Sequence, residues 1–296
     1  MADDVLRKLR ASLPALRPSE RRVGECILAD PTLPMTMDIN EVAEHADTSV
    51  TSVVRFARSL GYSGYAELRR VLAAAVGREQ SAMSRFGVSD SDIAADDDVQ
   101  SVVAKVAFHE GKAIEDTAAA IDLKALDAVA TAIVAAPRID IYGVASSGVA
   151  AIDLQQKLHR VGMVSFAWSD VHLALTSASV LTSGCVAIGF SHSGLTIDIA
   201  ESLAAARGRG ATTVLVTNFP ASPISRDVDH LLTTSASETR YRPGAMSSRI
   251  AQFAVIDFLF VRVAQQLSER FAEPLEHTYN AVQPHRLSYD RPRNGY

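Results

Sequence analysis

The sequence predicts an α/β protein, in which an all-α N-terminal part precedes a doubly wound parallel sheet of five strands. Short amphipathic segments separated by turn residues fill residues 4–76. From residue 138 onward, apolar runs alternate with helical patterns, which is typical of a parallel sheet with helices on both faces. The length of 296 residues suits roughly two domains of about 150 residues each.

The N-terminal helices are predicted from apolar spacing and from capping residues. Leucines at helical spacing form the first helix, which ends near Pro18, and Ser19 is the expected N-cap of the second. Pro31 and Pro34 are expected to stop that second helix. Three further helices are expected at residues 39–46, 49–60 and 64–76.

The helices expected at 39–46 and 49–60 have the pattern of a helix-turn-helix, whose second helix enters the DNA major groove. Ala43 and Ala46 are small where the two helices must cross closely. The residues expected to fill the angle between the helices are Val42, Val50 and Val53. Hydroxyl and guanidinium groups on the second helix suit phosphates and base edges. The expected DNA contacts are Thr48, Ser49, Thr51, Ser52, Arg55 and Arg58.

Charge supports DNA binding only locally. The chain has a formal net charge of −5, and such a field repels nucleic acid. Residues 49–78 contain five arginines against the single acidic residue Glu67, which leaves a local excess of +4. Two alternatives stay open at this point: an ordinary helical bundle with solvated arginines, and an adaptor that uses its basic helix pair to bind protein.

The second half of the chain is predicted as follows. Residues 78–98 are rich in Ser, Gly and Asp and are expected to be a linker, in which the acidic run 96–98 is a solvated helix start. Two helices follow at 99–120 and 123–136. The five strands are expected at residues 139–142, 163–167, 186–190, 213–216 and 230–232. The helices between and after them are expected at residues 147–161, 171–179, 195–207 and 245–268.

Hydroxyl-rich turns follow two of these strands. Strand 139–142 leads into Gly143-Val144-Ala145-Ser146-Ser147-Gly148, and strand 186–190 leads into Ser191-His192-Ser193-Gly194-Leu195-Thr196. Each turn opens a helix, whose N-terminus favours an anion, and ligands collect at the carboxyl ends of strands in such sheets. Gly143 allows a tight turn there and Gly148 a close backbone approach.

We expect these turns to hold one phosphate group with hydroxyls and main-chain amides, and without a metal or a cationic clamp. The expected contacts are Ser146, Ser147, Ser191, Ser193 and Thr196. The alternative is that these residues are only helix N-caps.

Several other kinds of protein are disfavoured. A dinucleotide site fits poorly, because residues 143–148 lack the three-glycine fingerprint and Asp170 lies slightly beyond the end of the next strand. Cys26 and Cys185 both lie in apolar patterns, so we expect neither a disulfide nor a metal site, and a reducing cytoplasm. No signal segment and no apolar stretch of about 20 residues is present, so we expect no membrane partner, and we expect no cofactor.

At this point the residues resemble a known family. The turns GVASSG and SHSGLT resemble those of the sugar isomerase (SIS) domain. The upstream segment TSVTSVVRFARSLGYSGYAELRR resembles the N-terminal domain of RpiR-type bacterial transcription regulators. The resemblance covers roughly residues 5–76 and 125–268, and the family often has Gly where this chain has Ala145. The division expected from it is a helix-turn-helix domain over 1–77, a linker over 78–98, a SIS domain over 99–283 and a disordered tail over 284–296.

The resemblance implies a cytoplasmic regulator of sugar metabolism, a homodimer or homotetramer that binds double-stranded operator DNA. Its SIS domain would bind a phosphosugar effector that modulates operator binding. The resemblance also places Glu238 near the sugar, with Arg240, Arg242 and Arg249 close by. The alternative is an aldose–ketose phosphosugar isomerase with an extra helical domain, for which Glu238, His159 and His192 are the acid–base candidates. A sensor that is not an enzyme is preferred, because a helix-turn-helix has no role in an isomerase.

Overall fold

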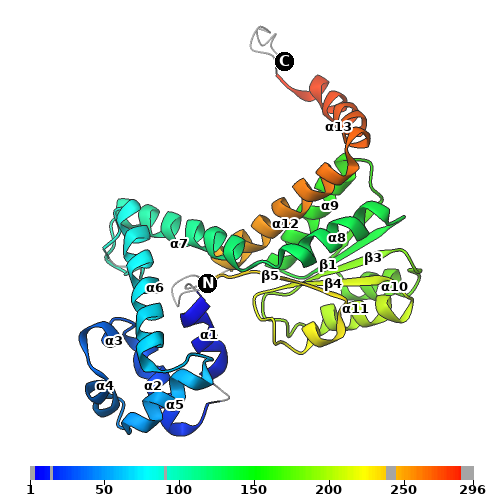
Figure 1. Cartoon of the computed structure of the whole chain (residues 1–296). Coiled ribbons are helices and arrows are strands. Elements are labelled where there is room, and N and C mark those ends of the chain that lie inside the picture. Colours follow the sequence, from blue (N-terminus) through cyan, green and yellow to red (C-terminus); the bar gives the residue numbers. More distant parts are fainter. Residues whose placement is uncertain (1–3, 14–15, 90–91, 238–244, 288–296) are drawn as a thin grey trace. The chain divides into compact units, whose positions relative to one another are not determined.

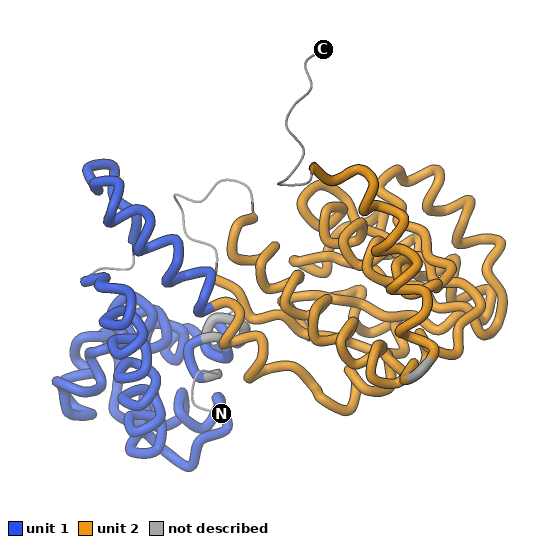
Figure 2. Tube along the Cα trace, turned by 90° about the horizontal axis from the view of Figure 1, so that it is seen from above, with its two compact units in different colours: residues 1–112 blue, residues 113–296 orange. Residues whose placement is uncertain are grey.

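The computed structural model describes residues 4–13, 16–89, 92–237 and 245–287 (Figure 1). The chain divides into two units, residues 1–112 and residues 113–296 (Figure 2). Helix α7 (Val99–Ala120) crosses this division, so its first part belongs to unit 1 and its last residues to unit 2.

Unit 1 consists of helices around an apolar core. Phe56 and Leu60 lie at its centre against Val23 and Ile27, and all four side chains are fully buried. The helices before α7 are α1 (Asp4–Ser12), α2 (Pro18–Ala29), α3 (Leu33–Thr36), α4 (Ile39–His45), α5 (Val50–Ser59) and α6 (Tyr65–Arg85). Helix α2 packs against α5, as does α4, so the predicted helix pair is supported from behind by a third helix.

Two elements of unit 1 differ from the sequence prediction. Helix α3 forms where the prolines were expected only to end a helix, because Pro34 occupies the first turn of α3, where no backbone N–H is needed. Helix α6 continues through Gly77 to Arg85, into the segment expected to be a linker. The residues after Gly77 are good helix formers, and they outweigh the cost of about 1 kcal/mol for one glycine.

The segment between α6 and α7 is fixed by a buried cation. The Nζ of Lys105 lies 2.8 Å from both carboxylate oxygens of Asp97 and 2.6 Å from the carbonyl oxygen of Asp92. The hydrogen bond from Lys105 lowers the pKa of Asp97. Asp98 accepts a hydrogen bond from the N–H of Ser101 at 2.7 Å in the first turn of α7. The acidic run therefore begins a helix as predicted, but Asp97 is paired with an ammonium group and is not simply solvated.

Unit 2 is a five-stranded, all-parallel sheet with helices on both faces, as predicted. Its strand order is β2-β1-β3-β4-β5. The strands are β1 (Ile139–Gly143), β2 (Ser165–Trp168), β3 (Val186–Phe190), β4 (Thr212–Thr217) and β5 (His230–Thr233). One face is covered by α8 (Leu123–Ala135), α9 (Ser146–Arg160) and α12 (Met246–Leu267) (Figure 1). The other face is covered by α10 (Val171–Ala178) and α11 (Ile197–Gly208), and the short helix η2 (Ile224–Asp227) connects β4 to β5.

Alternating residues of the central strands fill two cores. Ile141 and Ile188 face α8, α9 and α12, whereas Tyr142 and Ala187 face α10 and α11. Strands β1 and β3 are buried along their whole length, because both of their faces are covered.

No apolar stretch of about 20 residues was expected from the sequence, and this is wrong by length and composition. Helix α12 is the one described helix that is long and apolar enough to cross a membrane. Its apolar side chains are used in the core of unit 2, where Ala251, Val255, Leu259 and Val263 are buried against the sheet and its covering helices. Packing inside the domain therefore accounts for its composition.

The helix that follows α12 was not predicted. Helix α13 (Glu269–Val282) contains Pro274, and its apolar residues Phe271, Leu275, Tyr279 and Val282 are spaced along one helical face. The hydroxyl of Thr278 donates a hydrogen bond to the carbonyl of Arg160 at 3.2 Å, which attaches α13 to the end of α9. A short helix, η3 (Gln283–His285), ends this region, and residues 288–296 of the expected disordered tail lie outside the described residues.

A buried carboxylate connects β1, β2 and α10. Asp140 is fully buried and accepts hydrogen bonds from Arg138 at 2.8 and 3.2 Å, from Ser177 at 2.5 Å and from the indole of Trp168 at 3.1 Å. Burial, together with the neighbouring Asp140, raises the pKa of Tyr142, whose hydroxyl donates to the same carboxylate at 3.4 Å. Trp168, the only tryptophan of the chain, is therefore held at the end of the edge strand β2.

Candidate functional site

The two hydroxyl-rich turns leave the sheet at the carboxyl ends of neighbouring strands. Gly143, the last residue of β1, is in register with Phe190, the last residue of β3. The order of strands changes direction between them, because β2 lies on one side of β1 and β3 on the other. This is the switch point of a doubly wound sheet, where such folds bind their ligands. Helices α9 and α11 begin here on opposite faces of the sheet.

The turn after β1 is too tight for a side chain at two positions. A Cβ atom added at Gly143 would lie 2.3 Å from the carbonyl oxygen of Ser147, and one at Gly148 would lie 3.0 Å from that of Gly143. Ala145, the residue before α9, has φ +51° and ψ −127°, in a region that a residue with a Cβ rarely adopts. The backbone of this turn is therefore folded tightly on itself, at the cost of local strain.

Ser147 is held by a residue from another helix. Its Oγ accepts a hydrogen bond from the Nε2 of Gln252 in α12 at 3.1 Å, and Gln252 is buried. Ser146, the first residue of α9, is half-buried beside it.

The turn after β3 carries a small network of hydroxyl groups. The Oγ of Ser191 and the Oγ1 of Thr196 are 2.9 Å apart, and the Oγ of Ser191 also accepts from the N–H of Gly194 at 3.1 Å. The Oγ of Ser193 accepts from the N–H of Leu195 at 3.2 Å. Neither α9 nor α11 has a side-chain N-cap, since the residues in that position, Ala145 and Thr196, make no capping bond. The predicted phosphate contacts are therefore engaged with one another, with turn amides and with Gln252, and they do not serve as helix caps.

The loop after β4 supports this turn. The carbonyl of His192 accepts hydrogen bonds from the hydroxyl of Thr217 and from the N–H of Asn218, both at 3.0 Å. The imidazole of His192 packs edge-on against the ring of Phe219, with 5.7 Å between ring centroids. Gly194 has φ +65°, and a Cβ there would lie 2.1 Å from the Oγ of Ser222. Contacts with β4 and the loop that follows it therefore hold this turn in place.

The structure describes only some of the residues predicted to lie near the sugar. Glu238, Arg240 and Arg242 lie outside the described residues. Arg249 lies in the first turn of α12 and is half-buried. His159 was an acid–base candidate near the site, and this is wrong. It lies 12 residues after Ser147 in α9, which at about 1.5 Å per residue separates them by about 18 Å.

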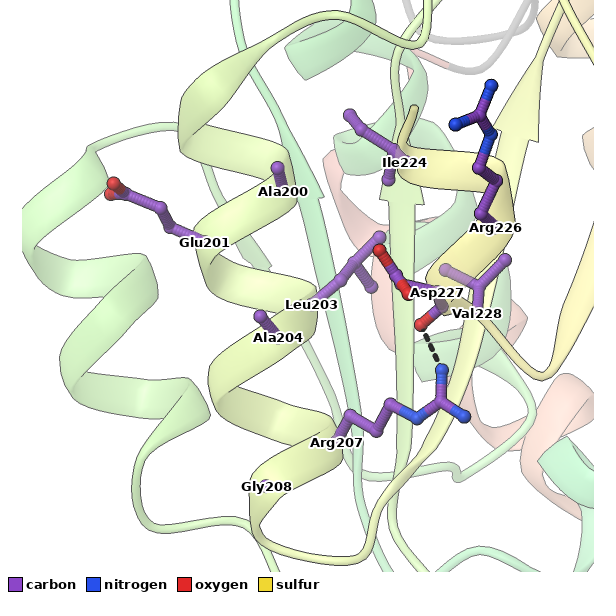
Figure 3. A pocket seen from close by; sticks show the side chains of 10 residues that line it. All are labelled: Ala200, Glu201, Leu203, Ala204, Arg207, Gly208, Ile224, Arg226, Asp227 and Val228. Atoms are coloured by element: carbon purple, nitrogen blue, oxygen red, sulfur yellow. Dashed lines mark hydrogen bonds between the residues drawn. The ribbon is translucent and has the colours of Figure 1, made fainter. Parts of the chain in front are cut away.

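A groove of about 640 Å³ lies between α11 and η2, and its lining does not include the hydroxyl-rich turns after β1 and β3 (Figure 3). Small and apolar residues of α11 line one side of it, and the guanidinium of Arg207 donates a hydrogen bond to the carbonyl of Asp227 at its edge. None of the predicted phosphate contacts lines this groove.

The described residues contain no cluster of three or more His, Cys, Asp or Glu side chains that could hold a metal ion. Both cysteines have free thiols, and Cys185 is buried whereas Cys26 is half-buried. Burial raises the pKa of the Cys26 thiol, which disfavours its reactive thiolate form.

In unit 1, α4 and α5 form the predicted helix-turn-helix, and each begins at a capping side chain. Asp38 accepts from the N–H groups of Asn40 and Glu41 at 2.7 and 3.0 Å, and Glu41 accepts in return from the N–H of Asp38 at 2.6 Å. These backbone hydrogen bonds lower the pKa of Asp38. Ser49 caps α5 by accepting from the N–H of Ser52 at 3.3 Å. Ser49, expected to contact DNA, therefore has a structural role as well.

The turn between the two helices is fixed by α2. Arg22 donates hydrogen bonds to the carbonyls of Ala46 and Asp47, at 3.2 and 2.6 Å, and the N–H of Thr48 donates to Ala43 at 2.8 Å. The small residues Ala43 and Ala46 are buried in the crossing as predicted, together with Val42 and Val53. Val50 was expected to fill the same angle, and this is wrong, because its side chain is 37% exposed on the first turn of α5.

One exposed face of α5 carries the side chains that suit DNA. Thr51, Arg55 and Arg58 are spaced at i, i+4 and i+7 and are all exposed. The Nε of Arg58 donates to the carbonyl of Ser63 at 3.4 Å, whereas the guanidinium of Arg55 has no hydrogen bond or ion pair with any described residue. Arg55 is therefore free to extend toward a partner.

Comparison with known proteins agrees with both regions. Residues 3–79 match the model of the helix-turn-helix domain of the rpiR family, and residues 132–262 match that of the SIS domain. An uncharacterized HTH-type transcriptional regulator of Caldanaerobacter subterraneus subsp. tengcongensis is 37% identical, over 96% of this chain and 99% of its own length. The HTH-type regulator YbbH of Bacillus subtilis is 30% identical, over 96% of this chain and 97% of its own.

Solved structures share this fold. The Vibrio vulnificus NanR protein complexed with ManNAc-6P matches 96% of this chain and all of its own, with 25% identity and a TM-score of 0.60. The sugar isomerase domain of an RpiR transcription factor from Sphaerobacter thermophilus matches 60% of this chain and 98% of its own, with 21% identity and a TM-score of 0.54, which shows the fold alone. Fold and site together define a helix-turn-helix regulator with a SIS domain. The chain belongs to the rpiR family of HTH-type transcriptional regulators.

Proposed function

We propose that this chain is a DNA-binding regulator of sugar metabolism whose SIS domain binds a phosphosugar effector at the switch point between β1 and β3. The observation that carries the proposal is the convergence of two hydroxyl-rich turns on that point, in the same chain as a helix-turn-helix. The similar NanR protein was solved with ManNAc-6P, a phosphosugar, which supports this class of ligand. The proposed contacts are Ser146, Ser147, Ser191, Ser193 and Thr196, with Glu238 near the sugar.

The DNA-binding surface is the exposed face of α5 together with its N-terminal end. Arg55 and Arg58 supply positive charge, and Thr51 supplies a hydroxyl that reaches a phosphate or a base edge. Thr48, Ser49 and Ser52 lie at the start of the same helix, where backbone N–H groups and the helix dipole also favour a phosphate. We place this activity in the cytoplasm, where the DNA is.

Coupling between the two activities needs more than one copy of the chain. Half-sites on B-DNA repeat at about 34–36 Å, so two recognition helices must hold that separation in a homodimer or homotetramer. A phosphosugar that draws the two turns and α12 together would change the separation. A coupling free energy of about 1–3 kcal/mol is sufficient for regulation.

A mobility-shift titration tests the proposal directly. The full chain is titrated onto duplex DNA from the region beside its own gene, with and without ManNAc-6P and a panel of hexose, pentose and amino-sugar phosphates. We expect a salt-dependent shift whose midpoint moves with at least one phosphosugar and with none of the unphosphorylated sugars. A DNA affinity that no phosphosugar changes would contradict the effector role. Absence of any mobility shift would contradict DNA binding.

An isomerase activity is not part of the proposal. Aldose–ketose isomerisation requires a base positioned to move a proton between carbons, and the described part of the site offers hydroxyls and His192 but no paired acid and base. Structures of putative sugar-phosphate isomerases, such as one from Listeria monocytogenes at 21% identity and a TM-score of 0.56, share the fold alone. Incubation with aldose and ketose phosphates, followed by NMR, is expected to show no interconversion, and turnover would overturn this part of the account.

A further inference from the structure

The chemistry of the proposed phosphate site restricts the form of its ligand. Resting on the proposed function, we propose that the site selects the dianionic form of a phosphate ester, because protein N–H groups fix its serine hydroxyls as donors. Gln252 of α12 is the positioning residue that fixes the hydroxyl of Ser147 in α9 as a donor.

A hydroxyl group has one proton to donate and two lone pairs that accept. At Ser147 one lone pair is occupied by the Nε2 of Gln252, and at Ser193 one is occupied by the N–H of Leu195. Each of these hydroxyls keeps its proton for the ligand. Ser191 accepts from Gly194, and the 2.9 Å contact between Ser191 and Thr196 uses one of their two protons. One proton of that pair remains for the ligand.

The site therefore presents three hydroxyl protons, from Ser147, from Ser193 and from the Ser191–Thr196 pair. A dianionic phosphate ester has three terminal oxygens that only accept, which matches this set. In a monoanionic ester one of the three oxygens carries a proton and less negative charge, so it accepts a hydrogen bond from its donor more weakly. Charge-assisted hydrogen bonds are roughly twice as strong as neutral ones, so the monoanion is disfavoured.

The orientation of Ser147 depends on Gln252. Gln252 is buried in α12 and is 2% exposed, so it does not exchange this hydrogen bond freely with water. If Gln252 were replaced by a group that only accepts, Ser147 would donate its proton to that group and lose it for the ligand. Gln252 therefore acts through Ser147 and is a positioning residue.

Other titratable groups lie around the site and must be separated from this effect. His192 lies in the turn itself, and its protonation at acid pH would strengthen the binding of any anion. That effect has the opposite sign to the one proposed. The charged and titratable side chains of the helices around the turns come from four elements. They are Asp153, Lys157, His159 and Arg160 of α9, Asp170 and His172 at the start of α10, Asp198, Glu201 and Arg207 of α11, and Arg249, Asp257 and Arg262 of α12.

The first experiment compares inorganic phosphate with inorganic sulfate on the full chain between pH 5.5 and pH 8. Sulfate remains a dianion over this range, so it reports the pH dependence of the protein alone. Binding is followed by Trp168 fluorescence and by the shift in melting temperature, at constant ionic strength. We expect sulfate affinity to stay level or to rise toward acid pH. Phosphate affinity, relative to sulfate, should fall about tenfold for each pH unit below the second pKa of phosphate.

A constant ratio of phosphate to sulfate affinity across the range would overturn the selection of the dianion while leaving the proposed phosphate site intact. Failure of both anions to bind at every pH would overturn the proposed function itself, and this inference with it.

The second experiment tests Gln252 with sulfate as the probe. Gln252→Leu is expected to weaken sulfate binding by roughly 10- to 100-fold in the wild-type chain, and to have no further effect in a Ser147→Ala background. Gln252→Glu should lose affinity at pH 8 and regain part of it at acid pH, because a protonated carboxyl group can again donate to Ser147. Gln266→Leu, on the same helix but bonded to Asp127, is the matched control.

A purely structural role for Gln252 predicts a pH-independent loss that adds to the loss from Ser147→Ala. Either that additivity or unchanged sulfate binding by Gln252→Glu would overturn the positioning role. Melting temperatures establish that each variant is folded. If a Gln252 variant does not fold, the sulfate affinity of Ser147→Ala still tests whether the Ser147 hydroxyl contacts the anion.

Discussion

The two candidate sites of this chain approach phosphate groups in opposite ways. The face of α5 is exposed and carries arginines, and the guanidinium of Arg55 has no partner among the described residues. The turns after β1 and β3 rely on hydroxyl groups that the protein holds in place: Ser191 is buried, and Ser147 is fixed by the buried Gln252. A flexible arginine side chain suits reversible binding to DNA, whereas a fixed set of hydroxyl donors suits one small anion.

This difference has consequences for how each site responds to its surroundings. DNA contacts made by exposed cations release counterions and weaken steeply as salt rises. Hydrogen bonds from fixed neutral donors in a partly buried site are screened much less. The chain therefore combines a salt-sensitive output with a sensor that responds to the chemistry of one ligand.

The largest effect is expected on the stability of unit 2, at the tightly packed turn after β1. Gly143→Ala places a Cβ atom 2.3 Å from a backbone oxygen, which must destabilise unit 2 by about 3 kcal/mol. Gly77→Ala in α6 meets no atom within 4 Å and should stabilise unit 1 by up to about 1 kcal/mol. Urea unfolding of both variants measures the contrast, and equal stability of the two variants would show that the turn after β1 is not as tight as described.

The next largest effect separates the two sites. Ser191→Ala combined with Ser193→Ala removes two donors to a charged ligand, so phosphosugar affinity should fall about 100-fold or more. DNA affinity without effector should be unchanged. Calorimetry and mobility shift measure the two activities, with Ser179→Ala and Ser225→Ala together as a control outside the site. A folded variant that loses both activities would contradict the separation of the two sites.

A smaller effect is expected on the exposed face of α5. Arg55→Ala should weaken DNA binding by about 1–3 kcal/mol and reduce the salt slope by about one, while phosphosugar binding is unchanged. Arg160→Ala removes the same charge from an exposed position in unit 2 and is the matched control. If Arg55→Ala and Arg160→Ala weaken DNA binding equally, only the overall charge matters and α5 is not the recognition helix.

The smallest effect concerns the strain before α9. Ala145 has φ +51°, so Ala145→Gly relieves the strain and should stabilise unit 2 by about 1 kcal/mol without weakening phosphosugar binding. The midpoint of urea unfolding measures this change. A destabilised Ala145→Gly variant would mean that the conformation of this residue is not strained.

Much of the fold could be predicted, because apolar spacing marks buried elements directly. The strand 186–190 was predicted with its observed bounds, and β1 and β5 to within one residue. Strand β3 is buried along its whole length and is therefore a continuous apolar run. Helix α13 was not predicted, although Phe271, Leu275 and Tyr279 recur in it at helical spacing. Pro274, a residue that usually interrupts a helix, lies inside this stripe. The exposure of Val50 could not be predicted either, because the first residue of a helix can face either side of the crossing.

The candidate sites were predictable to a similar extent. Hydroxyls placed just after two strands are visible in the sequence, and the topology brings both turns to one edge of the sheet. Gln252 was not predicted, because it lies 105 residues from its partner Ser147 and only the packing of α12 on α9 brings them together. The capping role of Ser49 was hidden for a related reason, because a serine at the start of a helix serves equally as a cap and as a phosphate contact.

Calorimetric titration measures whether two neighbouring turns bind a phosphate ester with fixed hydroxyl groups, as proposed. The full chain and its Ser191→Ala, Ser193→Ala double variant are titrated with ManNAc-6P and other sugar phosphates, each beside its unphosphorylated sugar. We expect saturable heat from at least one phosphosugar with the wild-type chain, and none from its unphosphorylated form or with the variant. Flat traces for every phosphosugar, or equal binding by the double variant, would contradict it.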